Sequence, residues 1–242
     1  MPCIGMPTRS SRSTRTRPTD YSRSGSARAT APRSSEPWVA EYVGVEVDEE
    51  AVRHAEDLYS HAKSSFLSYD AARLPFDDSS FDIVISFQVL EHVQDPDDFV
   101  PEARRVVRDA GVVLIVTPNR NHRLDDGERP WNRYHVREFD PDELAALMRQ
   151  SFDRIEMYGI HGSQAMNDIE CSRVARARKL ARLDPIGLRY RLPESLDTKL
   201  RVALRRRSGN VVATPAEIGV EYMRHTRDDT ASSLDLLAVG RP

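Results

Sequence analysis

The sequence has few cysteines, no long apolar segment and little net charge, and each absence excludes a class of protein. Its two cysteines, Cys3 and Cys171, are too few for a disulfide framework and stand in no metal-ligand spacing. No apolar run approaches the roughly 20 residues that a transmembrane helix needs. A formal net charge of -3 gives no overall attraction to nucleic acid or to an anionic membrane. We therefore expect a cytoplasmic protein with no transmembrane segment and no nucleic-acid partner.

The first 37 residues lack the features of folded sequence. They are rich in Ser, Arg, Thr and Pro, carry almost no acid and show no apolar period. They could be a disordered tail, a transit peptide, or the product of a shifted reading frame or wrong start. We favour the last, because a doubly wound nucleotide-binding domain begins with a strand, a glycine-rich turn and a helix. This chain enters at what reads as the second strand, so residues 38–242 are the predicted domain.

The clearest unit of that domain lies between residues 81 and 119. Two short apolar runs, Ile83–Phe87 and Val112–Val116, lack alternation, which is typical of strands buried on both faces of a parallel sheet. Asp95 is the predicted N-cap of an amphipathic helix between them, and Gly111 is its predicted end. A strand, a helix and a strand in this order predict a parallel, right-handed crossover.

Further elements are predicted on both sides of this unit. Strands are expected at Tyr42–Val47 and Ser65–Ser68 before it, and at Phe152–Ile160 and Ser233–Val239 after it. Asp48 is placed to cap the helix after the first of these strands. Asp140 and Glu143 predict a capping box, and residues 162–223 read as an insertion with two basic helices, residues 172–183 and 196–207. Such basic surfaces are usually solvated, but they could contact an anionic surface.

Three motifs in order carry a family resemblance: Asp82-Ile83-Val84-Ile85-Ser86, Leu90-Glu91-His92-Val93 and Thr117-Pro118-Asn119. Together they resemble the centre of the class I S-adenosylmethionine-dependent methyltransferases, in the small-molecule branch that includes the ubiquinone-biosynthesis O-methyltransferases. The resemblance implies an α/β, Rossmann-like sheet that is mostly parallel, with an antiparallel last strand between strands five and six. It also implies S-adenosyl-L-methionine as the cofactor. The family's first strand and helix are missing, either lost or replaced by the disordered tail. We therefore expect the strands at Tyr42–Val47 and Asp82–Phe87 to lack the neighbour that they share in the family.

The same resemblance assigns cofactor-binding roles to five residues. Glu46, at the end of the second strand, would accept hydrogen bonds from the ribose hydroxyls, although a plain loop acid is the alternative. Asp70 and Ala71 would meet the adenine amino group and ring nitrogen, unless Asp70 only forms a turn. Phe87 and Gln88 would line the cofactor at the carboxyl end of the fourth strand.

One part of the family pattern is absent from the sequence. In the family a G-x-G-x-G turn lets the backbone approach the methionine part of the cofactor at a helix N-terminus. Nothing before Tyr42 supplies such a turn, because Gly5 and Gly25 are isolated. We therefore predict that this chain binds cofactor weakly or not at all, and a micromolar affinity would contradict this.

The candidate catalytic residues are two histidines. His135 lies in the polar segment 120–138, which suits a wall over an acceptor substrate, and His92 follows the fourth strand. Either could act as the base for a hydroxyl acceptor, although His92 could instead be structural. No metal site is evident. The predicted function is methyl transfer to a small-molecule, lipid or glycan acceptor, and the alternative is a degenerate methyltransferase fold that serves as a binding module.

Overall fold

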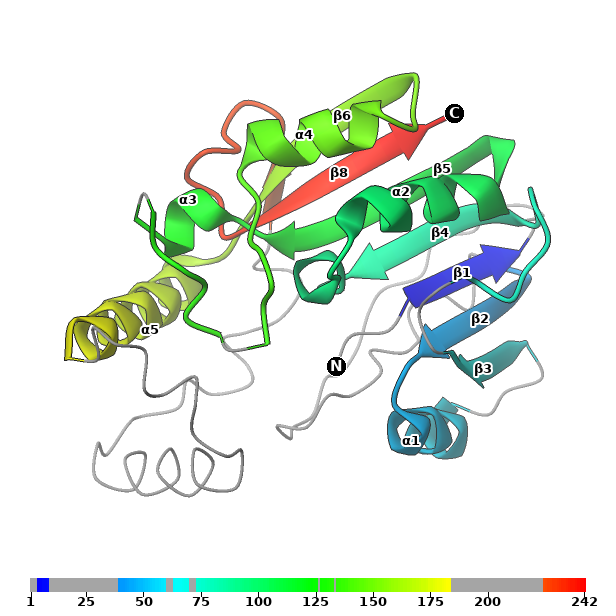
Figure 1. The fold of residues 1–242 in the computed structure, drawn as a ribbon, viewed down its shortest axis with the longest axis horizontal. Coiled ribbons are helices and arrows are strands. Elements are labelled where there is room, and N and C mark those ends of the chain that lie inside the picture. Colours follow the sequence, from blue (N-terminus) through cyan, green and yellow to red (C-terminus); the bar gives the residue numbers. More distant parts are fainter. Residues whose placement is uncertain are drawn as a thin grey trace.

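The computed structural model describes residues 4–8, 39–59, 63–69, 73–125, 127–132, 134–183 and 224–242. Figure 1 shows their arrangement as one sheet with helices α2 and α4 side by side across one face. The elements in chain order are β1 Ile4–Thr8, β2 Glu41–Glu46, α1 Glu49–Tyr59, β3 Ser64–Ser68, β4 Phe81–Phe87, the 3-10 helix η2 Leu90–His92, α2 Pro96–Val106, β5 Val107–Pro118, α3 Arg120–Arg123, α4 Pro141–Arg149, β6 Arg154–His161, α5 Gln164–Leu183, β7 Arg224–Thr226 and β8 Asp235–Arg241.

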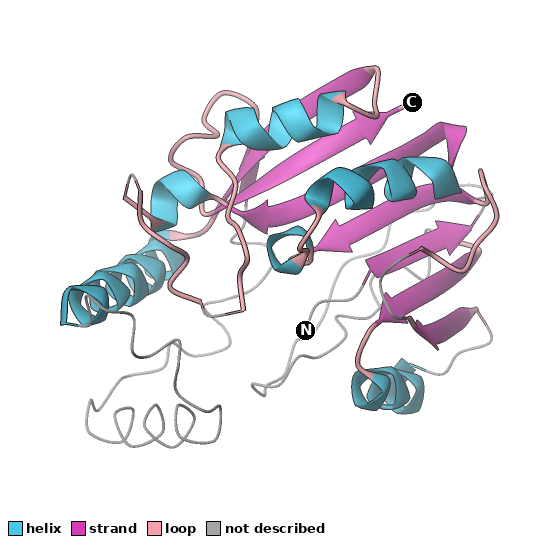
Figure 2. Ribbon diagram, viewed as in Figure 1, coloured by secondary structure: helices cyan, strands magenta, loops and turns pink. Residues whose placement is uncertain are grey.

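The sheet has eight strands in the order β3-β2-β1-β4-β5-β8-β6-β7 (Figure 2). The pairs β2–β3 and β4–β5 are parallel, as a crossover connection requires. The last strand, β8, lies antiparallel between β5 and β6, which confirms the topology that the sequence predicted. The strand β7 at the sheet edge was not predicted.

The strand β1 corrects one expectation about the centre of the sheet. Its backbone lies between β2 and β4 and is antiparallel to both, so the prediction that these strands would lack a shared neighbour is wrong. Two facing strand edges carry rows of unpaired N–H and C=O groups, and an extended segment that pairs with both satisfies them. Residues 9–38, which hold most of the predicted tail, lie outside the described residues.

The main core forms where α2 and α4 pack on β4, β5 and β8. Fully buried side chains come from both layers; they are Val100, Val106, Val113, Ile115, Leu144, Met148, Leu236 and Ala238. The alternate residues Val112 and Leu114 of β5 are only partly buried, because the described helices α2 and α4 cover the other face. We predicted that both faces of Val112–Val116 are buried. In β5, consecutive residues are buried only from Ile115 to Pro118 among the described residues.

The crossover helix ends earlier than its sequence suggested. Helix α2 stops at Val106, since Val107 already pairs with Phe81 and begins β5. Gly111 therefore lies within the strand and does not cap the helix. An added Cβ at Gly111 would lie 2.7 Å from the backbone oxygen of Asp82, so close strand approach explains this glycine.

The predicted helix caps have different outcomes. Asp95 occupies the N-cap position of α2, but its side chain makes no capping hydrogen bond. Asp140 and Glu143 form the predicted capping box of α4 in both directions. Asp48 Oδ1 accepts from the amide of Glu50 at 2.9 Å, which confirms it as the cap of α1.

The predicted insertion is described only in its first part. Helix α5 contains the first predicted basic helix, residues 172–183, and begins eight residues before it at Gln164. The second predicted basic helix, residues 196–207, lies outside the described residues.

Candidate cofactor and acceptor site

The predicted cofactor residues of two strands lie at the same edge of the sheet. Ile4 of β1 pairs with Val45 on one side and with Ser86 on the other, so these three residues form one row across the sheet. Glu46 and Phe87 each follow that row by one residue at the carboxyl ends of parallel strands. Two strand spacings separate them, which is about 10 Å.

The carboxylate of Glu46 is buried and fixed by the turn that follows β2. The residue is 5% exposed, and its Oε1 accepts hydrogen bonds from the amides of Val47 at 2.8 Å and Asp48 at 3.4 Å. The side chain of Asp48 caps helix α1 instead, so Glu46 and Asp48 have different hydrogen-bond partners. An acid held in this way has the position that a ribose-binding carboxylate needs.

The other two predicted adenosyl contacts, Asp70 and Ala71, lie outside the described residues. The residue that precedes them is described. The amide of Tyr69 donates to the carbonyl oxygen of Glu46 at 3.0 Å, so Tyr69 lies beside the predicted ribose acid.

Beyond β4 the chain turns sharply at Gln88. Phe87 is 46% exposed, which is unusual for a large apolar side chain at the end of a core strand. Gln88 has φ 56°, in the left-handed region that costs a non-glycine residue roughly 1 kcal/mol or more. Two contacts hold it there: its amide donates to the carbonyl oxygen of Val116 at 2.8 Å, and its Nε2 donates to Asp235 Oδ1 at 3.3 Å. Burial raises the pKa of Asp235.

The two predicted catalytic histidines, far apart in sequence, are in contact. The rings of His92 and His135 are perpendicular, with 4.8 Å between their centroids. The segment after α3 is attached to η2 by the amide of Val136, which donates to the carbonyl oxygen of Glu91 at 2.8 Å. His92 Nδ1 lies 2.9 Å from the carbonyl oxygen of Tyr134 and donates to it, since a carbonyl can only accept. Burial lowers the pKa of His92 and favours the neutral ring.

A buried acid that the sequence did not point to orients His135. Glu138 Oε1 lies 2.6 Å from His135 Nδ1, with side-chain exposures of 0% and 5%. The carboxylate accepts a hydrogen bond from Nδ1, and in the neutral tautomer that this contact selects the lone pair is on Nε2. Sequence reasoning missed Glu138 because the segment is irregular and carries no recognisable motif.

Glu91 is a second buried acid beside the histidine pair. It is 1% exposed, its Oε2 accepts from Thr117 Oγ1 at 3.0 Å, and its Oε1 has no hydrogen-bond partner in the part of the chain that the structure describes. Burial raises the pKa of Glu91. One potential ligand atom from each of Glu91, His92 and His135 lies within 4.8 Å of the others, an arrangement that could hold a metal ion. The sequence showed no metal-ligand spacing because one of the three residues comes from a separate segment.

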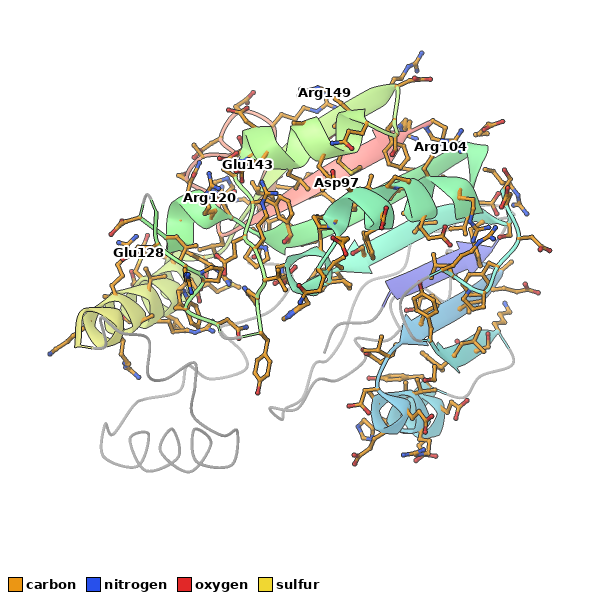
Figure 3. All side chains as sticks on the ribbon, viewed as in Figure 1. Asp97, Arg104, Arg120, Glu128, Glu143 and Arg149 are labelled. Carbon is orange, nitrogen blue, oxygen red and sulfur yellow. The ribbon has the colours of Figure 1, made fainter. Side chains whose placement is uncertain are left out.

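Helices α3 and α5 form a wall next to these residues. Arg120 of α3 pairs with Asp140 and Glu143 at the start of α4, and Figure 3 shows Arg120 and Glu143 on these facing elements. The Trp131 ring lies near two cations: the centroid is 5.8 Å from Arg123 Cζ and 5.3 Å from Arg173 Cζ. The segment 120–138 is thus held in place by contacts with α4 and α5. Among its described aromatic residues, Tyr134 is the exposed one, at 50%.

Comparison with solved structures identifies the fold. The structure of the cyclase SpnF matches 87% of this chain and 69% of its own, with a TM-score of 0.54 and 16% sequence identity. A SAM-dependent methyltransferase of Thermotoga maritima matches 82% of this chain and 72% of its own, with a TM-score of 0.50 and 17% identity. The chain therefore has the class I methyltransferase fold, and likeness at this identity speaks for the fold alone.

Sequence comparison finds methyltransferases among the relatives of this chain. Residues 24–115 match the family model described as "Methyltransferase domain". A relative in Mycobacterium tuberculosis, named "Probable S-adenosylmethionine-dependent methyltransferase", is 34% identical over 129 residues, which are 53% of this chain and 46% of that protein. A ubiquinone biosynthesis O-methyltransferase of Roseobacter denitrificans is 30% identical over 111 residues, 38% of this chain and 43% of that protein. The chain thus covers less than half the length of these relatives.

These matches agree with the predicted family, the class I S-adenosylmethionine-dependent methyltransferases, and with S-adenosyl-L-methionine as the cofactor that the resemblance implies. Among the described helices, none combines the length and the apolar character that crossing a membrane requires.

Proposed function

We propose that this chain is a methyltransferase that transfers the methyl group of S-adenosyl-L-methionine to a hydroxyl of a small-molecule, lipid or glycan acceptor. One observation carries the proposal: the predicted cofactor residues Glu46 and Phe87 end the parallel strands β2 and β4 at one edge of the sheet, and the histidine pair comes from the segments that follow β4 and β5. Ligands of open α/β sheets bind at that edge. The names of two relatives, the ubiquinone biosynthesis enzyme and a tocopherol O-methyltransferase of Arabidopsis thaliana, support oxygen as the acceptor atom. We place the reaction in the cytoplasm.

The reaction is a direct displacement. The donor supplies a methyl group on a positively charged sulfur, so the S–CH₃ bond breaks as the O–CH₃ bond forms, and the acceptor oxygen loses its proton. The protein has to hold the two reactants in line and keep water out. Catalysis then depends on how the acceptor oxygen is brought to a deprotonated state.

Each predicted cofactor residue contacts a different part of S-adenosyl-L-methionine. Glu46 accepts from the ribose hydroxyls, Asp70 and Ala71 meet the adenine, and Phe87 and Gln88 pack against the adenosyl group. The fixed turn at Gln88 supports this role, because strained backbone at a strand end is typical of binding sites and is held here by Val116 and Asp235.

His92 and His135 act on the acceptor. Both have Nδ1 occupied by a fixed acceptor, so each presents the lone pair of Nε2. Such a lone pair can take a proton or bind a cation, and either would favour an ionised acceptor oxygen. Replacing either histidine by alanine should lower the rate of methyl transfer about 10²–10⁴-fold.

The donor should bind weakly. At the edge where the family has a glycine turn after a parallel first strand, the described residues have the beginning of the antiparallel strand β1. No described helix N-terminus follows β1 at that edge, so the cradle of amides for the methionine part is missing from the described residues. Isothermal titration with S-adenosyl-L-methionine should give a Kd of about 1 mM, near -4 kcal/mol.

The matched variant in that titration is Glu46→Gln, which keeps the size of the side chain. It should weaken binding further, by about 10-fold, because an amide presents one acceptor oxygen where the carboxylate has two. Glu41→Gln at the start of the same strand is the control and should have no effect. A micromolar Kd for the unaltered chain would contradict the weak-binding prediction, and equal affinities for the two proteins would remove Glu46 from the site.

The alternative is a binding module that keeps the fold without catalysis. The replaced central strand favours it, since β1 runs opposite to the direction that places a glycine turn at the cofactor edge. A methylation assay at saturating S-adenosyl-L-methionine with a mixture of phenol, sugar and lipid acceptors separates the two functions. Product that disappears in the His135→Ala variant supports the enzyme. Bound cofactor without product supports the module.

A further inference from the structure

We propose that Glu91, His92 and His135 bind a divalent transition-metal ion of the zinc class. The three residues come from η2 and from the segment before α4, and one potential ligand atom of each lies within 4.8 Å of the others. In tetrahedral zinc sites, ligand atoms about 2.1 Å from the metal lie about 3.4 Å from one another. The group therefore has to contract only slightly, through side-chain rotation, to close around an ion.

The hydrogen bonds of the two histidines have the pattern of metal ligands. A metal-bound histidine donates its other ring N–H to a carboxylate or to a backbone carbonyl, which fixes the tautomer. His135 Nδ1 is held by Glu138, and His92 Nδ1 is held by the carbonyl of Tyr134. Both histidines have one of these two partners, so Nε2 is the atom that each offers to a cation.

The third ligand supplies an independent observation. Among the described residues, the buried Glu91 Oε1 has no hydrogen-bond partner, although Oε2 of the same carboxylate accepts from Thr117. An unsatisfied buried carboxylate oxygen carries a large desolvation penalty. A cation bound at Oε1 would remove that penalty, and no described side chain takes this place.

The charges around the group also favour a cation. Besides Glu91, the buried Glu138 and the partly buried Asp235 act on this region. The guanidinium of Arg123 lies 4.0 Å from Asp235 and 3.3 Å from Glu170, so it is shared with a fourth acid. Buried carboxylates outnumber the positive groups beside them, and a divalent ion would balance the excess.

The ligand types select the metal. Calcium and magnesium prefer sites made of oxygen atoms, whereas imidazole nitrogen suits zinc and its neighbours in the first transition series. Two histidines and one glutamate form a catalytic zinc set that leaves a coordination position open. With the proposed function, on which this step rests, the acceptor hydroxyl would bind at the open position. Coordination would lower its pKa, and the displaced proton would leave to solvent.

The test measures metal binding without methyl transfer. The full chain is treated with a chelator and titrated with Co²⁺, whose visible absorption intensifies in a four-coordinate site, and Zn²⁺ then competes for that site. We expect one ion per chain. His92→Ala and His135→Ala should each weaken binding by about 100-fold, and Glu138→Gln, which acts only through His135, by about 10- to 100-fold. His54→Ala, at an exposed position on α1, is the control and should leave binding unchanged.

Four outcomes decide the proposal. Failure of the unaltered chain to bind either ion overturns it, as does binding that survives both histidine substitutions. If an alanine variant does not fold, the milder Glu91→Gln, which retains a group able to accept from Thr117, takes its place. Donor titration is a separate measurement. Cation binding without donor binding therefore supports the metal site and counts only against the proposed function, while methyl transfer by a chelated, metal-free chain overturns the catalytic role of the ion.

Discussion

At the scale of single residues, the site is built from side chains with fixed partners. Glu46 is held by two backbone amides, His135 by a buried carboxylate, and Gln88 by a strand carbonyl and Asp235. Side chains restrained in this way lose little further freedom when a ligand binds, which favours precise positioning. Each of them is therefore a better target for substitution than the exposed charges on α1 or α5.

Gly111 gives a prediction about stability at this scale. In Gly111→Ala the new Cβ would meet two backbone oxygens, those of Asp82 at 2.7 Å and Arg108 at 3.0 Å, and neither can move without disturbing the strands. The free energy of unfolding should fall by about 1–3 kcal/mol. Urea unfolding followed by circular dichroism measures it. The control is Ala110→Gly at the exposed neighbouring position, and an equal loss in both variants would show that the Cβ contact is unimportant.

At the scale of elements, the ion pair of Glu102 with Arg105 on helix α2 contacts the chain before β4, where Arg105 also pairs with Asp78. Glu102 accepts two hydrogen bonds from Arg105, at 2.6 Å and 2.8 Å, and its Oε1 also accepts from the amide of Leu74 at 2.7 Å. Arg105 in turn donates to the carbonyl oxygens of Leu74 and Phe76. These hydrogen bonds fix the position of residues 74–76 against helix α2.

The same ion pair predicts a pH dependence of stability. The hydrogen bonds from Arg105 hold the pKa of Glu102 below its ordinary value of 4.5. A carboxyl with a depressed folded-state pKa stabilises the fold above its unfolded pKa, and this contribution is lost as the pH falls through the folded pKa. Glu102→Gln should therefore reduce the free energy of unfolding by about 1.5–3 kcal/mol at neutral pH. The difference from the unaltered chain should shrink below pH 4.5.

Urea unfolding of both proteins at about pH 7 and about pH 4 checks this prediction. Glu49→Gln is the control, because the ion pair of Glu49 with Arg53 is exposed at 75% and 66% of the two side chains. It should change stability little at either pH. A Glu102→Gln deficit that stays constant between the two conditions would assign the loss to packing rather than to charge.

At the scale of the whole molecule, β1 completes the sheet. It joins β3 and β2 to the rest of the sheet, because β2 and β4 are each hydrogen-bonded to β1 and are not neighbours in the strand order. A strand of five residues thus lies between the strand that carries Glu46 and the strand that carries Phe87. We therefore expect the integrity of the sheet to depend on this pairing.

A proline in β1 tests that dependence. Gly5 pairs with Gly44 on one side and Ile85 on the other. Gly5→Pro removes a backbone donor from a central strand and should lower the free energy of unfolding by about 3 kcal/mol. Gly5→Ala, which keeps the N–H, is the matched control. Thermal unfolding followed by circular dichroism distinguishes them, and equal midpoints for the two variants would mean that β1 does not pair as the structure has it.

Local sequence patterns were enough to predict much of the fold. Apolar runs gave β2 to β6 and β8, and the motif order gave the family and the antiparallel place of β8. The capping box of α4 was also predictable, since its two acids stand three residues apart. Gly111 was misread because a glycine after a helical pattern resembles a stop, and only the nearby backbone of Asp82 shows why it is there.

The sequence by itself determined most of the strands and helices, because periodicity is a local property of the chain. Its short motifs carried the family resemblance, which implied the class of protein and the strand order around β8. Only the tertiary structure placed His92 against His135, provided Glu138 and Glu91 as their buried neighbours, and put an antiparallel β1 in the centre of the sheet. Pairings between distant segments depend on which edges and side chains remain unsatisfied once the sheet has formed. No local pattern encodes that.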